Sequence, residues 1–273
     1  MYNKELLLQG SLPPLETVEF NELRSELVVK DTRSLNIENF KHMAAKHFSN
    51  NKSNRLSGFD AFKQLDIVVG CQQFIDNLIS KNGLSGLQIF EHDYHYYKML
   101  DPNIKYVTLD TLTPDKPLLI AMAFPGHLGK HRQMDQIIDI CNKKNIDVHI
   151  DCSWLVSAFD IEFDFDQPCI KSFAMSFSKA YGLHWNKVGI RWSRKEDKHD
   201  TVTILNRTDA VSRATLFIAQ QYMDRFPIDH LCSKYKDEYF KICKDLRLRP
   251  SNIIHACFSI DRSVLFGMKN FFY

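Results

Sequence analysis

The chain has 273 residues, of which 44% are hydrophobic and 25% charged, so it suits one large globular domain with, at most, a small appendage. Its 35 basic and 33 acidic residues leave a formal charge of +2 with no basic cluster, which argues against nucleic-acid binding. No apolar run suits a membrane helix or a signal peptide, and seven cysteines without CxxC spacing predict a reduced, cytoplasmic protein.

The first 40 residues read as an N-terminal arm with little periodicity. From about residue 60, strands and helices alternate. Apolar runs bounded by glycine, proline or polar residues predict strands at 65–70, 86–91, 117–124, 147–153, 170–178 and 188–193. Apolar residues at helical spacing predict helices at 71–79 and 130–144.

This alternation predicts an α/β fold, with a mostly parallel, doubly wound sheet and helices on both faces. The pattern changes after residue 208. A long amphipathic helix at 210–226, a second helix at 231–246 and a strand-like run at 253–260 predict a shortened C-terminal lobe. We therefore expect an arm (1–40), a large domain (41–208), and a long helix with a truncated small lobe (209–273).

Lys179 lies between an apolar strand and a glycine turn, in the stretch MSFSKAYGLHWNKVGIRW (175–192). A buried lysine is costly unless it is neutral, paired or used covalently, and a primary amine can form a Schiff base with an aldehyde cofactor. Ligands of doubly wound sheets lie beyond the carboxyl ends of the strands. Gly70, Cys71, Asp151 and Lys179 all follow predicted strands, so we expect them to meet there.

Four segments carry a resemblance to a known family. HIDCSW (149–154) resembles its strand end with a carboxylate and an aromatic residue, and SFSKAYGL (176–183) its Ser-x-Ser-Lys motif. VVGCQQFIDNLI (68–79) is similar to its phosphate turn and helix, and FEHDYHYY (90–97) to its ring-stacking segment. Over about residues 45–225, the chain resembles a short, divergent fold-type I pyridoxal-phosphate-dependent aminotransferase of class I/II.

The resemblance implies the cofactor pyridoxal 5'-phosphate and a role for each matching residue. Lys179 would form the internal aldimine and then shuttle the proton at the substrate α-carbon, and Asp151 would pair with the ring nitrogen. The N–H groups of Cys71 and Gln72 would bind the phosphate. Further site residues are the hydroxyls of Ser176 and Ser178 at the phosphate, and Tyr94 stacked on the ring, with His95, Tyr96 and Tyr97 as alternatives.

The chain departs from the family at several positions. Lys187 replaces an arginine, which leaves a point charge for the phosphate, and Arg191 is a candidate to compensate. Trp154 replaces a tyrosine near the phenolic oxygen of the cofactor. In FPGHLG (124–129), Gly126 or His127 takes the place of the family's asparagine.

The resemblance implies an aminotransferase acting on an amino acid or amine and a keto acid, as a homodimer in amino-acid metabolism. A lyase or decarboxylase on the same fold, and a non-catalytic pseudoenzyme or scaffold, remain alternatives. The short C-terminal lobe leaves Arg262 as an unaligned candidate for the substrate carboxylate. We expect no metal site, because Gly129 interrupts the His127/His131 pair and no HExxH motif is present.

Overall fold

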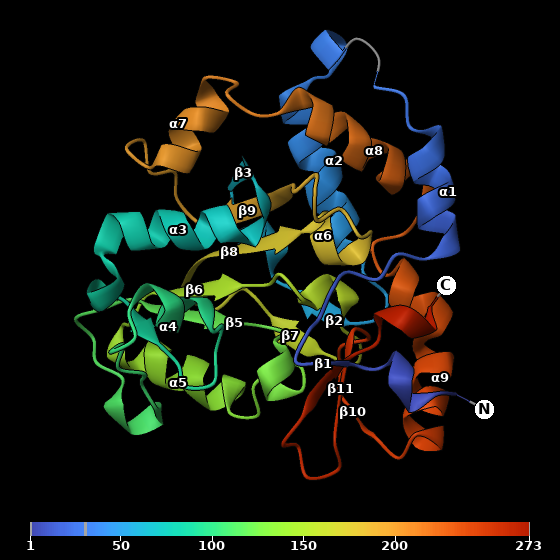
Figure 1. Cartoon of the computed structure of the whole chain (residues 1–273). Coiled ribbons are helices and arrows are strands. Elements are labelled where there is room, and N and C mark those ends of the chain that lie inside the picture. The colour runs from blue at the N-terminus through green and yellow to red at the C-terminus, as the bar shows by residue number, and fades with distance from the viewer. Residues whose placement is uncertain (1, 30–31, 273) are drawn as a thin grey trace.

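The computed structural model describes residues 2–29 and 32–272. A six-stranded sheet with the order β3-β9-β8-β6-β5-β4 forms its centre (Figure 1). The strands of this sheet are β3 (Gln64–Val68), β4 (Gln88–Ile89), β5 (Leu118–Ala121), β6 (Val148–Asp151), β8 (Ile170–Ser176) and β9 (Gly189–Ser193). Strands β4, β5, β6 and β8 pair in parallel, whereas β9 is antiparallel to both β8 and β3. The predicted mostly parallel sheet is confirmed, and β3 and β8 end at the same edge.

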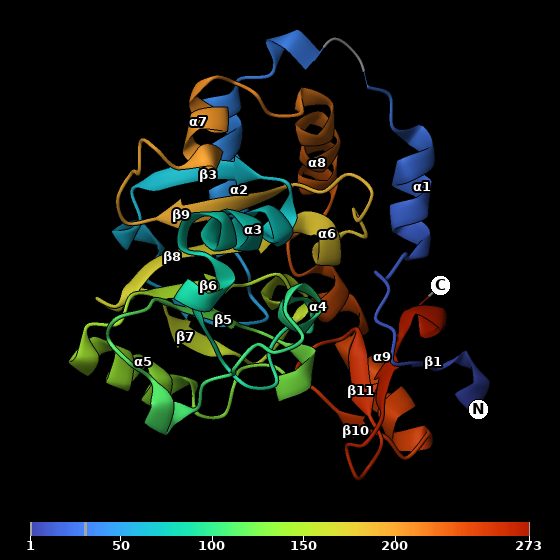
Figure 2. The same cartoon turned by 60° about the vertical axis from the view of Figure 1, so that its left-hand side comes forward.

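Helices cover both faces of this sheet, as predicted. On β9, Trp192 packs against Phe48 of one helix, while the neighbouring Arg191 lies beside Phe74 of another. Successive strand residues point to opposite faces, so these two helices, α2 and α3, lie on opposite sides of the sheet (Figure 2). The helices are α1 (Val18–Glu26), α2 (Ile37–Ser49), α3 (Gly70–Asn82), α4 (Tyr96–Leu100), α5 (Met134–Lys144), α6 (Phe177–Ala180), α7 (Thr201–Arg207), α8 (Arg213–Arg225) and α9 (His230–Asp245).

Two apolar cores hold the sheet between its helices. The smaller one lies under α3, where Phe74 and Leu78 pack on Leu119 of the sheet. The larger one lies on the opposite face and contains a stack of aromatic rings, in which Phe173 and Trp192 have centroids 4.9 Å apart. Each such ring pair adds about 1 kcal/mol beyond its buried area. The strand ends that carry the site are therefore held on a rigid layer.

The N-terminal segment joins the C-terminal lobe. Strand β1 (Leu8–Gln9) pairs with β12 (Leu265–Gly267), which continues through β11 (Ala256–Phe258) to β10 (Arg249–Pro250). The first and last described segments of the chain lie beside this sheet in Figures 1 and 2. The expected arm thus contains a strand of the small lobe as well as α1. Strands β2 (Arg55–Ser57) and β7 (Glu162–Asp164) form a separate two-stranded parallel sheet.

The seven cysteines are all free and buried. No helix among the described residues has the length and apolar character needed to cross a membrane.

Candidate active site

Lys179 lies in α6, a single turn that begins directly after β8. Ser176 caps this turn, because its Oγ accepts the N–H of Ser178 at 3.2 Å. The Ser176 Oγ also lies 2.9 Å from the Ser178 Oγ and donates to the carbonyl oxygen of Val188 at 3.2 Å. The short polar sequence Ser-x-Ser-Lys therefore fixes the lysine at the carboxyl end of the strand.

The amine of Lys179 lies over an aromatic face. Its Nζ is 4.1 Å from the centre of the Trp154 ring, a cation–π distance. Burial, and then the nearby positive charge of Lys187, lower the pKa of Lys179 from 10.5 to about 8. At pH 7 the neutral, nucleophilic amine is then about 300-fold more abundant than in an ordinary lysine.

Asp151 ends β6 and is 4% exposed. Its carboxylate accepts the N–H of Ser153 at 3.0 Å and the Ser153 hydroxyl at 3.3 Å. Burial raises the pKa of Asp151, and the hydrogen bonds from Ser153 oppose that rise. The thiol of Cys71 lies beside this carboxyl and donates to the carbonyl oxygen of Ala174 at 3.3 Å. A buried carboxyl of this kind suits a cationic partner.

The start of α3 forms a cup beside these strand ends. Val69, the residue before the helix, provides no side-chain cap, and its own N–H donates to the Gln73 side chain at 2.7 Å. Within the described residues, the N–H groups of Gly70, Cys71 and Gln72 at the first turn remain available. Gly70 has a φ of +66°, and a β-carbon there would lie 3.6 Å from both the Ser176 Oγ and the Lys187 Cβ. Free N–H groups, a hydroxyl and a lysine around a hollow are the donor set that binds a phosphate.

Among the four candidate aromatic residues, Tyr94 is the one that lines the cavity. Tyr96 stacks on Tyr94 with a centroid distance of 5.7 Å, and Tyr97 is fully buried behind it. Phe124 also lines the cavity, and its ring meets the Tyr94 ring edge-on, with centroids 6.5 Å apart. Tyr94 is therefore the member of this cluster whose ring reaches the cavity.

The nine residues that the resemblance assigns to cofactor binding line one cavity of about 300 Å³. These residues are Lys179, Asp151, Ser176, Ser178, Lys187, Cys71, Gln72, Tyr94 and Trp154. Sequence reasoning missed Pro14, Phe124 and His184, which also line it. Pro14 belongs to the N-terminal arm and His184 to the loop after Lys179, and neither position carried a recognisable pattern.

Two expectations about the site are wrong, and the unaligned candidate Arg262 does not belong to it. Arg191 cannot assist Lys187, because it forms buried ion pairs with Asp66 at 2.6 Å and Asp200 at 2.8 Å. In the segment 124–129, Phe124 lines the cavity, rather than either of the two expected replacements for asparagine. Arg262 lies fully exposed, close to Arg249 and Arg132, and does not line the cavity.

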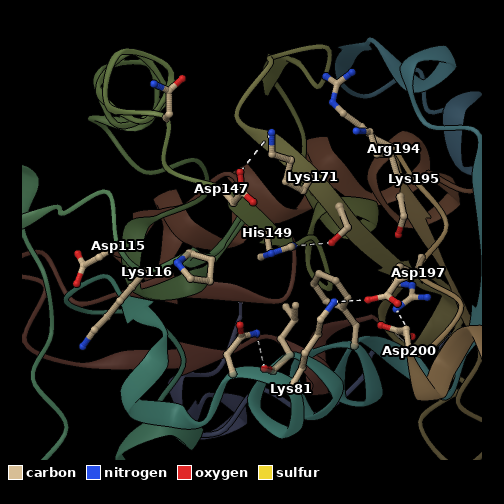
Figure 3. Close-up of a pocket in the computed structure, with 18 of the residues that line it drawn as sticks. Lys81, Asp115, Lys116, Asp147, His149, Lys171, Arg194, Lys195, Asp197 and Asp200 are labelled. Carbon is tan, nitrogen blue, oxygen red and sulfur yellow. Dashed lines mark hydrogen bonds and ion pairs between the residues drawn. The ribbon is translucent and has the colours of Figure 1, made fainter.

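A larger cavity of about 730 Å³ lies at the opposite edge of the sheet (Figure 3). Its charged rim is largely paired within the protein: Lys81 binds Asp197 at 2.5 Å and Lys171 lies 3.3 Å from Asp147. His149 contacts Ser172 at 2.7 Å on its floor. We place the candidate site in the smaller cavity, because there the lysine, carboxyl and helix start remain without ion-pair partners in the described residues.

The two histidines of HLGKH lie together, with the rings of His127 and His131 4.4 Å apart. Burial lowers the pKa of His127 to about 4. Within residues 2–29 and 32–272, no three histidine, cysteine or acidic side chains are placed to hold a metal ion.

No family model matches the sequence, and a comparison with curated proteins finds no match. Solved structures share its fold. Alanine aminotransferase from Pyrococcus furiosus is 12% identical with a TM-score of 0.61, over 90% of this chain and 73% of that one. Tyrosine aminotransferase from Leishmania infantum is 12% identical with a TM-score of 0.59, over 94% of this chain and 87% of that one.

A C-S lyase from Staphylococcus hominis, complexed with L-cycloserine in its external aldimine form, is also similar. It is 13% identical with a TM-score of 0.61, over 94% of this chain and 75% of the lyase. Aminotransferases and a lyase thus share one chain architecture with this protein at very low identity. The chain therefore has the fold of the fold-type I pyridoxal-phosphate-dependent transferases.

Proposed function

We propose that the protein binds pyridoxal 5'-phosphate in the smaller cavity and is an aminotransferase for an amino acid or amine. One observation carries the proposal: the Lys179 amine, with its pKa lowered to about 8, shares a cavity with the buried Asp151 carboxyl and an anion cup. Burial of a reactive amine costs stability, and functional sites are where proteins accept such costs. Solved structures of the same fold include enzymes described as PLP-bound.

The residues present fit this cofactor. The N–H groups at the start of α3, with Ser176, Ser178 and Lys187, would hold its phosphate in the hollow beside Gly70. Asp151 would pair with the ring nitrogen, since a buried carboxylate gains most from a cationic neighbour. Tyr94 would cover one ring face. Trp154 offers a single N–H donor near Lys179.

When bound, the cofactor supplies an aldehyde that condenses with a primary amine and a ring that accepts electrons from the substrate. Lys179 contributes the nucleophilic amine, because its site disfavours the ammonium form. The same amine is placed to take a proton from the substrate α-carbon and to return it elsewhere. The Asp151 carboxylate would keep the ring nitrogen protonated, and the Trp154 face would shield the amine from water.

A lyase or decarboxylase is the second candidate, because the same cofactor site supports both when the substrate is oriented differently. The solved structures of this fold include a C-S lyase and an L-threonine-O-3-phosphate decarboxylase from Porphyromonas gingivalis. A non-catalytic scaffold is the third. Two departures favour it: Trp154 stands where the family has a tyrosine, and apolar Phe124 lines the cavity.

Absorbance spectroscopy of purified protein tests cofactor attachment. We expect a visible band after addition of pyridoxal phosphate, and its loss in Lys179→Ala. Lys171→Ala, in the other cavity, is the matched control and should keep the band. A protein that takes up no cofactor contradicts the proposal.

Product analysis with a panel of amino acids and amines then separates the candidates. Keto-acid formation that needs an acceptor keto acid indicates an aminotransferase, and carbon dioxide or thiol release indicates a decarboxylase or C-S lyase. Bound cofactor without any turnover indicates a scaffold. We also propose a homodimer by analogy with the fold, and a monomeric mass by light scattering would contradict it.

A further inference from the structure

His255 is a buried histidine for which the proposed chemistry has no use. It lies in the C-terminal lobe, just before β11, and is 1% exposed. Its backbone oxygen accepts the N–H of Met268 at 3.0 Å, which fixes it within the small sheet. Its Nδ1 is fully buried and finds no hydrogen-bond partner in the described part of the chain. A polar group left unpaired in this way costs about 1–3 kcal/mol, so its position calls for an explanation.

The contacts of His255 lead to the site in two steps. The His255 ring meets the Trp154 ring edge-on, with centroids 5.4 Å apart and planes at 79°. The face of the same Trp154 ring lies 4.1 Å from the Nζ of Lys179. The histidine thus supports the indole from one side while the lysine amine lies against it.

The third contact of His255 comes from the N-terminal arm. Its Nε2 accepts the backbone N–H of Leu15 at 3.4 Å, and the preceding residue, Pro14, lines the cavity. An Nε2 that accepts a hydrogen bond carries no proton, so the ring is the neutral Nδ1–H tautomer. Burial and the charge of Lys179 also lower the pKa of His255 well below its ordinary value. A neutral ring here adds no positive charge beside the amine.

We propose that His255 is a positioning residue: docked by Leu15 and kept neutral, it holds Trp154 so that the indole covers and desolvates the Lys179 amine. The inference rests on the proposed role of Lys179 as the reacting amine. Three segments far apart in the sequence, the arm, the strand end after β6 and the small lobe, would then act together on one nitrogen. Releasing Trp154 would admit water to that nitrogen and raise its pKa.

Competitive labelling of cofactor-free protein tests this directly. Acetic anhydride is added across a pH range, and acetylation of Lys179 is measured by peptide mass spectrometry. His255→Gln keeps an acceptor near the Nε2 position but removes the ring, and we expect the labelling midpoint to rise by about half a pH unit or more. His255→Phe keeps the edge contact with Trp154 but loses the acceptor for the Leu15 N–H, so its midpoint should lie between those of the wild type and His255→Gln. His42→Gln, at an exposed position, is the matched control.

A folded His255→Gln protein with the wild-type midpoint overturns the proposal. A second measurement on the wild type keeps it testable where the variant does not fold. Nitrogen chemical shifts should show His255 as the neutral Nδ1–H tautomer down to pH 5, and a charged ring at pH 6 also overturns it. Because neither measurement needs bound cofactor, failure of the proposed function would appear separately, as absent pyridoxal-phosphate uptake with an intact labelling shift.

Discussion

Gly70 and Ser176 face each other across the cup at the start of α3: a β-carbon on the glycine would lie 3.6 Å from the serine Oγ. They come from segments more than a hundred positions apart, joined only because β3 and β8 end at the same edge of the sheet. The hollow between them is wide enough to accept a β-carbon in ordinary contact, but a branched side chain would fill it.

Gly70→Val should therefore abolish phosphate binding. We expect the affinity for pyridoxal phosphate to fall at least about 30-fold, because the valine methyls occupy the space of one or more phosphate oxygens. The variant also pays for a positive φ, which a branched residue tolerates poorly. Isothermal titration calorimetry with pyridoxal phosphate gives the affinity, and thermal unfolding gives the stability.

Gly10→Val is the matched control for that strain. Gly10 has the same φ of +66°, and within the part of the chain that the structure describes nothing lies within 4 Å of its β-carbon position. It should lose stability but keep cofactor affinity. Equal loss of affinity in both variants would show that strain, not occupancy of the cup, explains the effect.

Lys187 is the side-chain cation at the cup, and it also lowers the pKa of Lys179. Lys187→Gln should weaken pyridoxal phosphate about 10-fold, since hydrogen bonds to charged groups contribute about 1.5–3 kcal/mol. Affinity for pyridoxal, which lacks the phosphate, should fall less, because it loses only the effect of Lys187 on the pKa of Lys179. Lys187→Arg should bind pyridoxal phosphate at least as tightly as the wild type, because the guanidinium offers two parallel donors. Parallel loss of affinity for both compounds in Lys187→Gln would place this lysine elsewhere than at the phosphate.

Arg191 is structural. Besides its ion pairs with Asp66 and Asp200, it donates to the Thr203 hydroxyl at 2.9 Å, and it is 5% exposed. Arg191→Met leaves two buried carboxylates without their partner, so we expect a loss of about 3–5 kcal/mol in the free energy of unfolding, measured with urea. The control is Arg207→Met, which breaks a more exposed ion pair with Glu196 and should cost about 1 kcal/mol or less.

Cofactor titration of folded Arg191→Met protein adds a second readout. Affinity for pyridoxal phosphate should stay within about 3-fold of the wild type, because the arginine lines the other cavity. A larger loss in protein that remains folded would indicate that Arg191 does reach the phosphate.

The position of the site was predictable because parallel strands share their carboxyl edge. Asp151 and Lys179 each follow an apolar run, so their meeting required only the correct strand directions. Helix α2 was not predicted, although its sequence carries the signals of a helix. Asn36 accepts the N–H of Asn39 as its cap, and buried Ile37, Phe40, Ala44 and Phe48 follow at helical spacing. By contrast, α1 buries only Phe20 and Leu23 and lacks an amphipathic pattern.

The sequence could not predict that β9 runs antiparallel to its neighbours, or which distant segments contact each other. Arg191 is close to Lys187 in sequence, but β9 is antiparallel to β8, so each step from Gly189 leads away from the site. Pro14 and His255 reach the site through packing of the arm and the small lobe. Such contacts between segments leave no periodic signal in either of them.

Lys179 itself should limit the stability of the cofactor-free protein below pH 8. Its folded-state pKa, about 8, is lower than the ordinary 10.5, so folding disfavours the protonated amine. The penalty is full below pH 8, falls as the pH rises and vanishes above about 10.5. Lys179→Met, which removes it, should be more stable than the wild type by up to about 3 kcal/mol at pH 7.

The measurement is urea unfolding of both cofactor-free proteins from pH 7 to pH 10.5. The pKa of His255 lies well below its ordinary value, so this ring stays neutral over the whole window. The advantage of Lys179→Met should shrink steadily over this window, while Lys98→Met controls for the loss of one positive charge at an exposed position. An advantage that stays constant with pH would mean that the amine is ordinarily hydrated, and a water-exposed amine would not supply the nucleophile that the proposed function needs.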